Sequence, residues 1–208
     1  MKRETDVRDI LIENTIHLIA EGGFEKATTY AITHTGQKLR DIKMNEAYIY
    51  RLFGGKEKLY DAVFNSLDRE LVGVLQQSIT AVGDSPTEVR DKLYAIFEPI
   101  WRFVLSNEEH CRCYVRYYYS AYFKGSSLKK HNEQFDTIIK RVSPIFNEQA
   151  DVTAIMHSVF TAMLDFAVRV YNGDLEDKES NTPHVFTVLY GMMANYLKNK
   201  ETPMRSTM

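Results

Sequence analysis

The sequence predicts an all-α protein of about nine helices, three at the N-terminal end and six after them. Apolar residues recur at spacings of three and four through most of the chain, which is the period of an amphipathic helix. Glycine and proline interrupt this pattern at helix-length intervals. No stretch alternates apolar and polar residues for long enough to predict a strand. Hydrophobic residues make up 44% of the 208, which is enough to form a core.

Two helices are predicted at the start of the chain. The first covers 5–22 and is ended by a glycine pair, because glycine takes the left-handed conformation at a helix end at little cost. The second begins at Thr28 or Thr29, whose hydroxyl can accept a hydrogen bond from a free N–H of the first turn. It continues to about residue 43, either as one lengthened helix or as two short pieces.

The third predicted helix, 45–53, is short and has two different faces. Asn45 is its expected cap, since its side-chain oxygen can accept a hydrogen bond from the first turn. Ile49, Leu52 and Phe53 recur at i, i+3 and i+4 and form an apolar back. The other faces carry Tyr48, Tyr50 and Arg51. An aromatic and basic front on a short helix suits insertion into a groove of nucleic acid.

Six more helices are expected after this one. Gly54-Gly55 ends the short helix, and Lys56 begins a long helix that extends to Val82. Pro99 predicts a kink in the next helix, because proline removes a backbone donor and clashes with the preceding turn. The remaining helices are expected at 86–105, 107–123, 127–142, 151–172 and 183–199.

Composition limits the class of partner. The formal net charge is −2, so contact with DNA would have to come from a local basic patch. We find no apolar run long enough to span a membrane and no signal peptide, and therefore expect a cytoplasmic protein without membrane contact. The six histidines are scattered, and no hydrolase or phosphate-binding motif is present, so we do not expect an enzyme or a cofactor.

The two cysteines, Cys111 and Cys113, are too close in sequence to bond each other without strain. Metal binding is one interpretation, but no second Cys/His pair completes a tetrahedral site, and we expect no metal. A redox sensor is another. We favour plain packing thiols in a reducing compartment.

Three stretches resemble a known family. The run NEAYIYRLFGGKEKL at 45–59 resembles the recognition helix and the start of the fourth helix of the TetR family of transcription regulators. Upstream, IAEGGF at 19–24 and ATT at 27–29 are similar to the end of that family's first helix and the start of its second. The likeness covers about residues 8–65, and beyond it only the layout of helices is similar.

Three features depart from the family pattern. The segment 28–45 is several residues longer than the family norm, with the added length in 33–44. Asn14-Thr15 stands where a pair of small residues is usual, and the bulky Tyr48 occupies a small-residue position of the recognition helix. These differences concern the way in which the helices would meet DNA.

The resemblance implies a DNA-binding surface in a helix-turn-helix domain, 1–55. Tyr50 and Lys56 would bind phosphate, and Thr28 or Thr29 would donate to phosphate at the start of the second helix. The residues nearest to the bases or the backbone would be Asn45, Glu46, Tyr48 and Arg51.

The rest of the chain, 56–208, would be a domain for ligand binding and dimerisation. By resemblance, a homodimer would bind a roughly palindromic operator, repress transcription and be released by a small-molecule effector. The alternative is a helical ligand-binding or protein-interaction module that does not bind DNA.

An aromatic cluster is the candidate effector site. A pocket between kinked helices and an ordinary aromatic core are both consistent with it. The candidate lining residues are Phe97, Trp101, Tyr114, Tyr117, Tyr118 and Phe160.

The last two helices carry more apolar surface than one packing layer needs, which favours a two-fold four-helix interface over a simple core. The candidate interface residues are Met156, Phe160, Met163, Leu189, Met192, Met193 and Tyr196.

Overall fold

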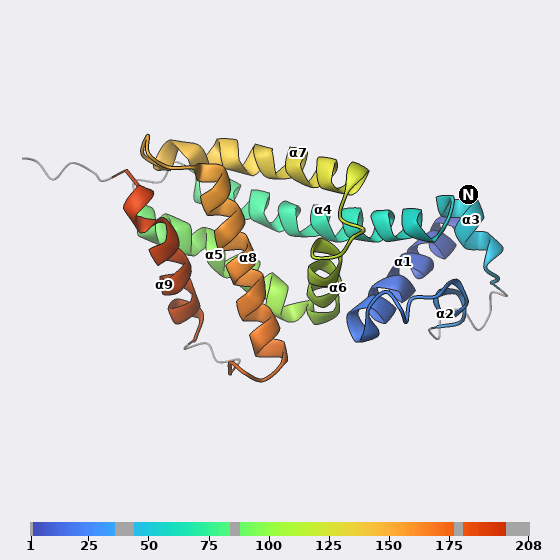
Figure 1. Cartoon of the computed structure of the whole chain (residues 1–208). Helices are drawn as coiled ribbons and strands as arrows, with labels where there is room; N and C mark the ends of the chain where they lie inside the picture. The colour runs from blue at the N-terminus through green and yellow to red at the C-terminus, as the bar shows by residue number, and fades with distance from the viewer. Residues whose placement is uncertain (1, 36–43, 84–87, 177–180, 199–208) are drawn as a thin grey trace, which may run out of the picture. The chain divides into compact units, whose positions relative to one another are not determined.

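The computed structural model describes residues 2–35, 44–83, 88–176 and 181–198, which are α-helical almost throughout (Figure 1). The side chains before Val7 are not among the described ones, and most of the predicted lengthened segment, 36–43, lies outside the described residues. The predicted all-α class is confirmed.

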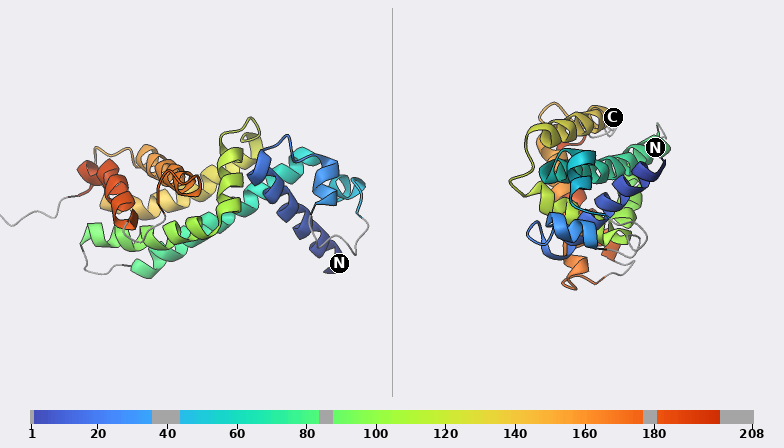
Figure 2. Two further views of the ribbon diagram at one scale, coloured as in Figure 1. Left: turned by 90° about the horizontal axis from the view of Figure 1, so that it is seen from below. Right: turned by 90° about the vertical axis from the view of Figure 1, so that its right-hand side faces the viewer.

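Nine α-helices occur in the described part of the chain, each ended by a turn or a short irregular segment. They are α1 Lys2–Gly22, α2 Thr29–His34, α3 Ala47–Phe53, α4 Lys56–Val82, α5 Val89–Ser106, α6 Glu108–Tyr118, α7 Gly125–Val142, α8 Val152–Tyr171 and α9 Thr182–Met193. Helix α4 continues without a break from Lys56 to Val82, and the left view of Figure 2 shows it lengthwise in teal.

Several helix starts follow the caps expected from sequence. Thr28 accepts a hydrogen bond from the backbone N–H of Ala31 at 3.1 Å and so caps α2. Asp151 accepts one from the N–H of Ala154 at 2.9 Å and caps α8. In each case a side-chain oxygen satisfies a donor that has no partner within the helix.

Two helices end earlier than their apolar periodicity predicts. α6 stops at Tyr118, not at 123, and the Ser120 hydroxyl bonds the carbonyl of Tyr117 at 2.7 Å just after that end. α9 stops at Met193, not at 199, because the chain turns through a 3₁₀ helix, Ala194–Tyr196, and then runs extended. Backbone hydrogen bonds to other segments replace the helical ones there.

By packing, the chain divides into two compact units. The first contains Met1–Val74 and Arg102–Gln134, and the second contains Leu75–Trp101 and Phe135–Met208. This division differs from the predicted boundary at residue 55, because the first part of α4 and all of α6 pack with the N-terminal helices.

The core of the first unit is aromatic. The ring of Phe64 on α4 stacks on Tyr117 and Tyr114 of α6, with ring centroids 4.5 and 5.1 Å away. The Tyr114 hydroxyl donates to Asp68 at 3.0 Å, and Asp68 also contacts His131 of α7 at 2.9 Å. These groups are almost fully buried, so the hydrogen bonds offset the cost of removing Asp68 from water.

The second unit is closed by its C-terminal segment. Phe146 pairs with Leu197 in an isolated antiparallel bridge, and the N–H of Asn147 donates to the carbonyl of Tyr196 at 2.8 Å. Phe146 and Leu197 are both buried in a cluster that includes Met193. These contacts explain why the last residues leave the helix.

α8 lies beside α9 in the second unit (Figure 1) and is unusually apolar for its burial. An 18-residue window of it has a mean hydropathy of 1.2, yet only 22% of that window is buried. By length and composition alone it is the one helix among the described residues that could cross a membrane, whereas no such run was expected from the sequence. An apolar helix that is incompletely buried is also expected where it forms an interface with another protein chain.

Candidate DNA-binding surface

The short helix α3 has its predicted apolar back turned into the first unit. Ile49 is fully buried beneath it. The N-cap of α3 is Glu46, which makes no side-chain cap hydrogen bond, whereas Asn45 was the expected cap. The Asn45 side chain lies one residue earlier and accepts a hydrogen bond from the N–H of Ala47, the first residue of the helix, at 3.1 Å. Gly54 and Gly55 have φ angles of 84° and 135°, which side chains with a Cβ rarely adopt. The helix therefore stops after Phe53 and the chain turns into α4.

Arg8 of α1 holds the other end of α3, a role that the sequence analysis missed. Its Nη1 donates to the carbonyl of Leu52 at 3.0 Å, and its guanidinium lies 4.3 Å from the ring centroid of Phe53. The carbonyl belongs to the last turn of α3, where no helical donor is available. Arg8 thus combines a charge-assisted hydrogen bond with a cation–π contact.

Asn14 of α1 does the same for α2. Its Nδ2 donates to the carbonyls of Ile32 and Thr35, at 2.9 and 2.7 Å. Its side chain is buried, so the amide replaces water at the C-terminal end of a six-residue helix. Asn14, which stands where the family usually has a small residue, therefore holds the end of α2 in place.

The outer face of α3 is aromatic and basic, as predicted. Tyr50 is 61% exposed, and Arg51 is exposed beside it. The Arg51 guanidinium lies 4.4 Å from the ring centroid of Tyr48. The ring restricts the position of the guanidinium, and an arginine held in this way suits recognition of phosphate or of a base edge.

Lys56 opens α4 at the edge of this face. Its Nζ lies 5.6 Å from the ring centroid of the buried Tyr60, so its stem follows the protein surface. Tyr60 donates its hydroxyl to the carbonyl of Ala27 at 2.8 Å, which joins the start of α4 to the segment before α2. Burial raises the pKa of Tyr60 far above the ordinary tyrosine range.

Thr29 and Glu46, both predicted at the DNA surface, bond each other: the Thr29 hydroxyl donates to the Glu46 carboxylate. The hydroxyl of Thr28 accepts from the backbone, and that bond leaves its hydrogen available. Of the two threonines, Thr28 is therefore better placed to donate to a phosphate. Glu46 adds a negative charge to a surface that is otherwise basic.

Two exposed residues on α2 escaped the sequence analysis. Tyr30 is 63% exposed and stacks on His34, with ring centroids 4.0 Å apart. The two lie at i and i+4, opposite the buried Ile32 and Thr33, and this spacing is the signal that could have identified them.

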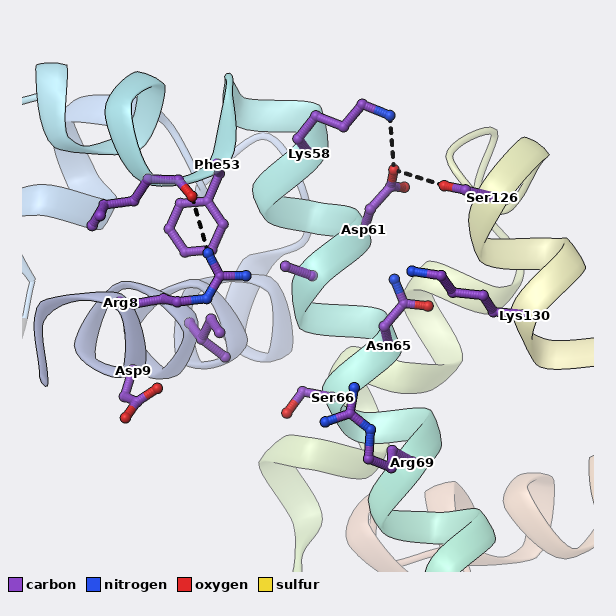
Figure 3. A pocket seen from close by; sticks show the side chains of 13 residues that line it. Arg8, Asp9, Phe53, Lys58, Asp61, Asn65, Ser66, Arg69, Ser126 and Lys130 are labelled. Atoms are coloured by element: carbon purple, nitrogen blue, oxygen red, sulfur yellow. Dashed lines mark hydrogen bonds and ion pairs between the residues drawn. The ribbon is translucent and has the colours of Figure 1, made fainter. Parts of the chain in front are cut away.

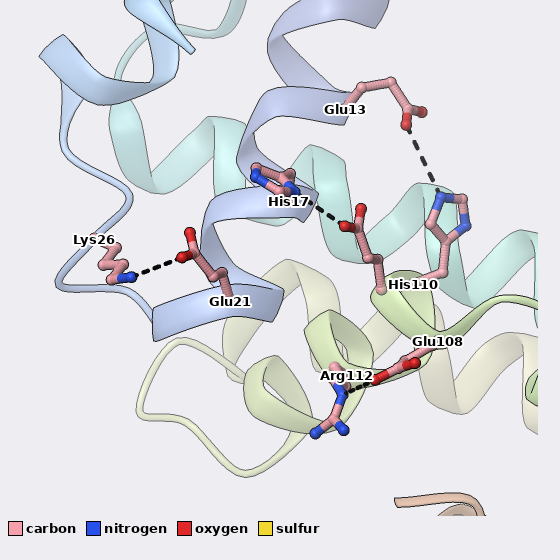
Figure 4. Close-up of polar contacts among 8 residues, drawn as sticks. Glu13, His17, Glu21, Lys26, Glu108, His110 and Arg112 are labelled. Atoms are coloured by element: carbon pink, nitrogen blue, oxygen red, sulfur yellow. Dashed lines mark hydrogen bonds and ion pairs between the residues drawn. The ribbon is translucent and has the colours of Figure 1, made fainter. Parts of the chain in front are cut away.

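Helix α1 is tied to α6 by polar contacts as well as by packing (Figure 4). His17 lies 3.0 Å from Glu109, and His110 lies 3.9 Å from Glu13 and 3.1 Å from Glu70 of α4. Each contact is an ion pair only when the histidine is protonated. They connect the helix that supports α2 and α3 to the following part of the first unit.

The predicted effector residues divide between the two units. In the first, Tyr114 and Tyr117 are core residues whose hydroxyls donate to Asp68 and Asp61, at 3.0 and 2.8 Å. Burial raises the pKa of both tyrosines far above the ordinary range. Tyr118 is only partly buried and stacks on Tyr114 at 6.1 Å. The hydroxyls of Tyr114 and Tyr117 are thus already engaged within the protein.

In the second unit, Phe97 and Trp101 of α5 stack at 5.9 Å, and Phe186 of α9 packs on Phe97 at 5.5 Å. Phe160 of α8 packs edge-on against Phe135 at 5.0 Å. All five are buried, so these candidates form an apolar aromatic interior.

The predicted dimer residues are of two kinds. Met192 and Tyr196 are exposed, at 37% and 40%, and Val188, which belongs to the same apolar repeat of the last helix, is 52% exposed. The others are partly or wholly buried within the single chain: Met156, Phe160, Met163, Leu189 and Met193.

Cys111 and Cys113 are both buried free thiols of the first unit. Burial raises the pKa of Cys113 well above the usual thiol range, which disfavours the reactive thiolate. Among the described residues no cluster of three or more His, Cys, Asp or Glu side chains has the arrangement of a metal site.

Solved structures with this fold are mostly TetR-type transcription regulators. A TetR family regulator from Marinobacter aquaeolei VT8 has a TM-score of 0.74 and 16% identity, over 92% of this chain and 98% of that one. A TetR-like regulator from Rhodococcus sp. RHA1 has a TM-score of 0.61 and 17% identity, over 91% and 94%. The transcriptional regulator FadR from Bacillus subtilis, solved in complex with stearoyl-CoA, has a TM-score of 0.58 and 14% identity, over 87% and 96%.

These matches cover 87–92% of this chain and 94–98% of the three neighbours, so the likeness extends over most of the fold. No protein family model and no curated protein sequence matches the chain. What is shared with these regulators is therefore the fold.

Proposed function

We propose that this protein is a DNA-binding transcription regulator of the TetR type, acting as a homodimer in the cytoplasm. The observation that carries the proposal is the exposed face of α3. Tyr50 and Arg51 project from a short helix that is fixed at its last turn by Arg8, within the fold of known regulators. A helix fixed in this way can enter a groove without losing its orientation.

On DNA, α3 would lie in the major groove. Arg51 and Tyr48 would be nearest to the bases, because both lie on α3 and arginine is the side chain that most often reads guanine in the major groove. Tyr50, Lys56 and Thr28 would contact phosphates on either side. The formal charge of the chain is −2, so this local patch would carry the electrostatic attraction.

The homodimer would form through α9 and the neighbouring α8. Val188 and Met192 of α9 and Tyr196 of the following 3₁₀ helix are exposed at four-residue spacing, and only 22% of the apolar window of α8 is buried. A two-fold axis at this face would pair two helices from each chain. Two copies of α3 would then address the halves of a palindromic operator.

A small-molecule effector would act through the second unit. Its aromatic interior around Phe97, Trp101 and Phe160 suits an apolar ligand. α4 supplies residues to both units, so a ligand that shifts it would change DNA affinity, and DNA would change ligand affinity by the same factor. The DNA-bound dimer would repress transcription, and the effector would release it from the operator.

Selection of bound duplexes from a random oligonucleotide pool tests the proposal. We expect enrichment of a palindrome whose half-sites are about one helical turn, or a multiple, apart. Tyr50→Ala should weaken binding to the selected duplex. Tyr119→Ala is a matched control, because Tyr119 is equally exposed in the same unit but lies outside α3. Failure to enrich any sequence, with no salt-dependent binding, would leave a helical module that does not bind DNA.

A further inference from the structure

A polar pocket of about 540 Å³ lies within the first unit (Figure 3). Helices α1, α3, α4 and α7 all contribute side chains to it, and Tyr50, Arg51 and Lys56 are not among them. Its volume is in the range of small-molecule sites. It is therefore separate from both the proposed DNA surface and the proposed effector region.

Basic groups outnumber acidic ones around the pocket. Arg8, Lys58, Arg69 and Lys130 line it, against Asp9 and Asp61. Asp61 is engaged by the protein itself: it accepts hydrogen bonds from the hydroxyls of Tyr117 and Ser127, at 2.8 and 2.9 Å. Lys58 lies 3.5 Å from the same carboxylate. The negative charge of Asp61 is thus partly offset by the protein itself. The other cations, Arg8, Arg69 and Lys130, therefore dominate the charge of the pocket.

Two of these cations have no acidic counterpart. Within the described ranges, no carboxylate lies within ion-pair distance of Arg69 or of Lys130. Figure 3 shows them on different helices, α4 and α7, with Asn65 between. A concave surface lined mostly by charges of one sign focuses their field and raises the attraction that such groups exert on an anion.

Arg8 approaches the same space from α1 and is already fixed. One nitrogen donates to the carbonyl of Leu52, and the plane rests over Phe53, so the guanidinium keeps further donors for a ligand. A restrained arginine loses little conformational freedom when it binds.

Asn65 supplies an independent sign of a missing partner. Its side-chain Oδ1 is buried and has no hydrogen-bond partner among the described residues. A buried amide left unpaired costs free energy, and a ligand or water in the pocket would remove that cost.

We propose that this pocket binds a small phosphate-bearing molecule. Arg8, Arg69 and Lys130 would hold the phosphate oxygens, since guanidinium and ammonium groups are the usual partners of phosphate. Asn65 Oδ1 would accept a hydrogen bond from an O–H or N–H group of the ligand. A free small molecule fits this concave space better than a DNA backbone, because the exposed face of α3 contributes nothing to the lining.

Isothermal titration with inorganic pyrophosphate, at fixed ionic strength and without DNA, tests the site. Saturable binding is expected, and Arg69→Gln and Lys130→Gln should each weaken it roughly tenfold or more. Both side chains are exposed, so the variants should fold like the parent. Lys129→Gln is the matched control, because it removes the same charge from the neighbouring position of α7, outside the pocket.

Three results would overturn the proposal. The first is the absence of saturable binding of pyrophosphate, and the second is equal weakening by Lys129→Gln and Lys130→Gln, which would indicate a diffuse charge effect. The third is a Lys130→Gln variant that binds pyrophosphate like the parent but shows a salt slope on duplex DNA reduced by about one charge. That result would make the pocket a DNA contact. The titration contains no DNA and does not depend on the proposed function.

Discussion

Replacing Asn14 by alanine should destabilise the first unit by removing the group that ends α2. The Nδ2 atom donates to two carbonyls, of Ile32 at 2.9 Å and of Thr35 at 2.7 Å. A buried hydrogen bond contributes about 1 kcal/mol net, and an acceptor left without a partner costs about 1–3 kcal/mol. Two bonds at a site where Asn14 is 8% exposed therefore give an expected loss of about 2–4 kcal/mol.

Asn14→Asp separates the donor effect from the effect of size. The carboxylate has nearly the same shape but turns oxygen, not N–H, toward the two carbonyls. We expect it to be at least as destabilising as Asn14→Ala at neutral pH. If packing alone mattered, Asn14→Asp would be close to the parent.

Urea unfolding followed by far-ultraviolet circular dichroism measures the free energy of unfolding of each variant. Asn132→Ala on α7 is the control, since Asn132 is exposed and should change stability by less than about 0.5 kcal/mol. An Asn14→Ala protein as stable as this control would refute the claim that the amide holds α2.

Three further predictions address pH, assembly and the charge of the DNA surface. Burial raises the pKa of Tyr60 and Tyr117, so the unfolded chain loses these protons first. The contribution of these two tyrosines to stability should be constant below about pH 10 and fall as pH rises beyond it. Urea titrations at increasing pH should show a shallower fall for a Tyr60→Phe/Tyr117→Phe protein. Val188→Glu should convert a dimer to a monomer in light scattering, whereas a charge change at the exposed Lys140 should not. Glu46→Gln should tighten binding to any duplex a few-fold in fluorescence anisotropy, because it removes a charge of the same sign as phosphate; an unchanged affinity would exclude Glu46 from the DNA surface.

Local chemistry made much of the fold predictable. The double glycine after Phe53 fixed the end of α3, and Thr28 and Asp151 fixed the starts of α2 and α8. Each of these signals depends only on nearby residues: a cap bonds within its own first turn, and glycine tolerates a positive φ wherever the chain must turn. The nine helices and the aromatic front of α3 followed from the same kind of local pattern.

Long-range contacts were not predictable in this way. Arg8 reaches Leu52 across 44 positions of sequence, and Asn14 reaches Ile32 across 18. Both residues occupy ordinary positions of an amphipathic helix, and only the fold brings them to the free carbonyls of another helix. Asn14 stood out only as a departure from the family pattern, which did not reveal its partner, and Arg8 carried no signal of its own.

The dimer surface illustrates a different limit. α9 is apolar on two sides, and periodicity could not decide which side faces the core. The structure buries Leu189 and Met193 and exposes Val188 and Met192, so the outward stripe is displaced by one residue from part of the predicted set. The bridge between Phe146 and Leu197 was invisible for a similar reason, because it joins segments that are distant in the sequence.

The measurement that tests the central claim most directly is the salt dependence of duplex binding for the parent and for Lys56→Ala. If the surface formed by α3 and the start of α4 binds phosphates, the logarithm of the parent's affinity should fall linearly with the logarithm of salt concentration. Lys56→Ala should weaken binding to all sequences alike and flatten that slope by about 0.9, the value for one phosphate contact. Lys129→Ala is the control, because Lys129 lies on α7 outside this surface. Equal salt slopes for the parent, Lys56→Ala and Lys129→Ala would contradict this placement of the DNA.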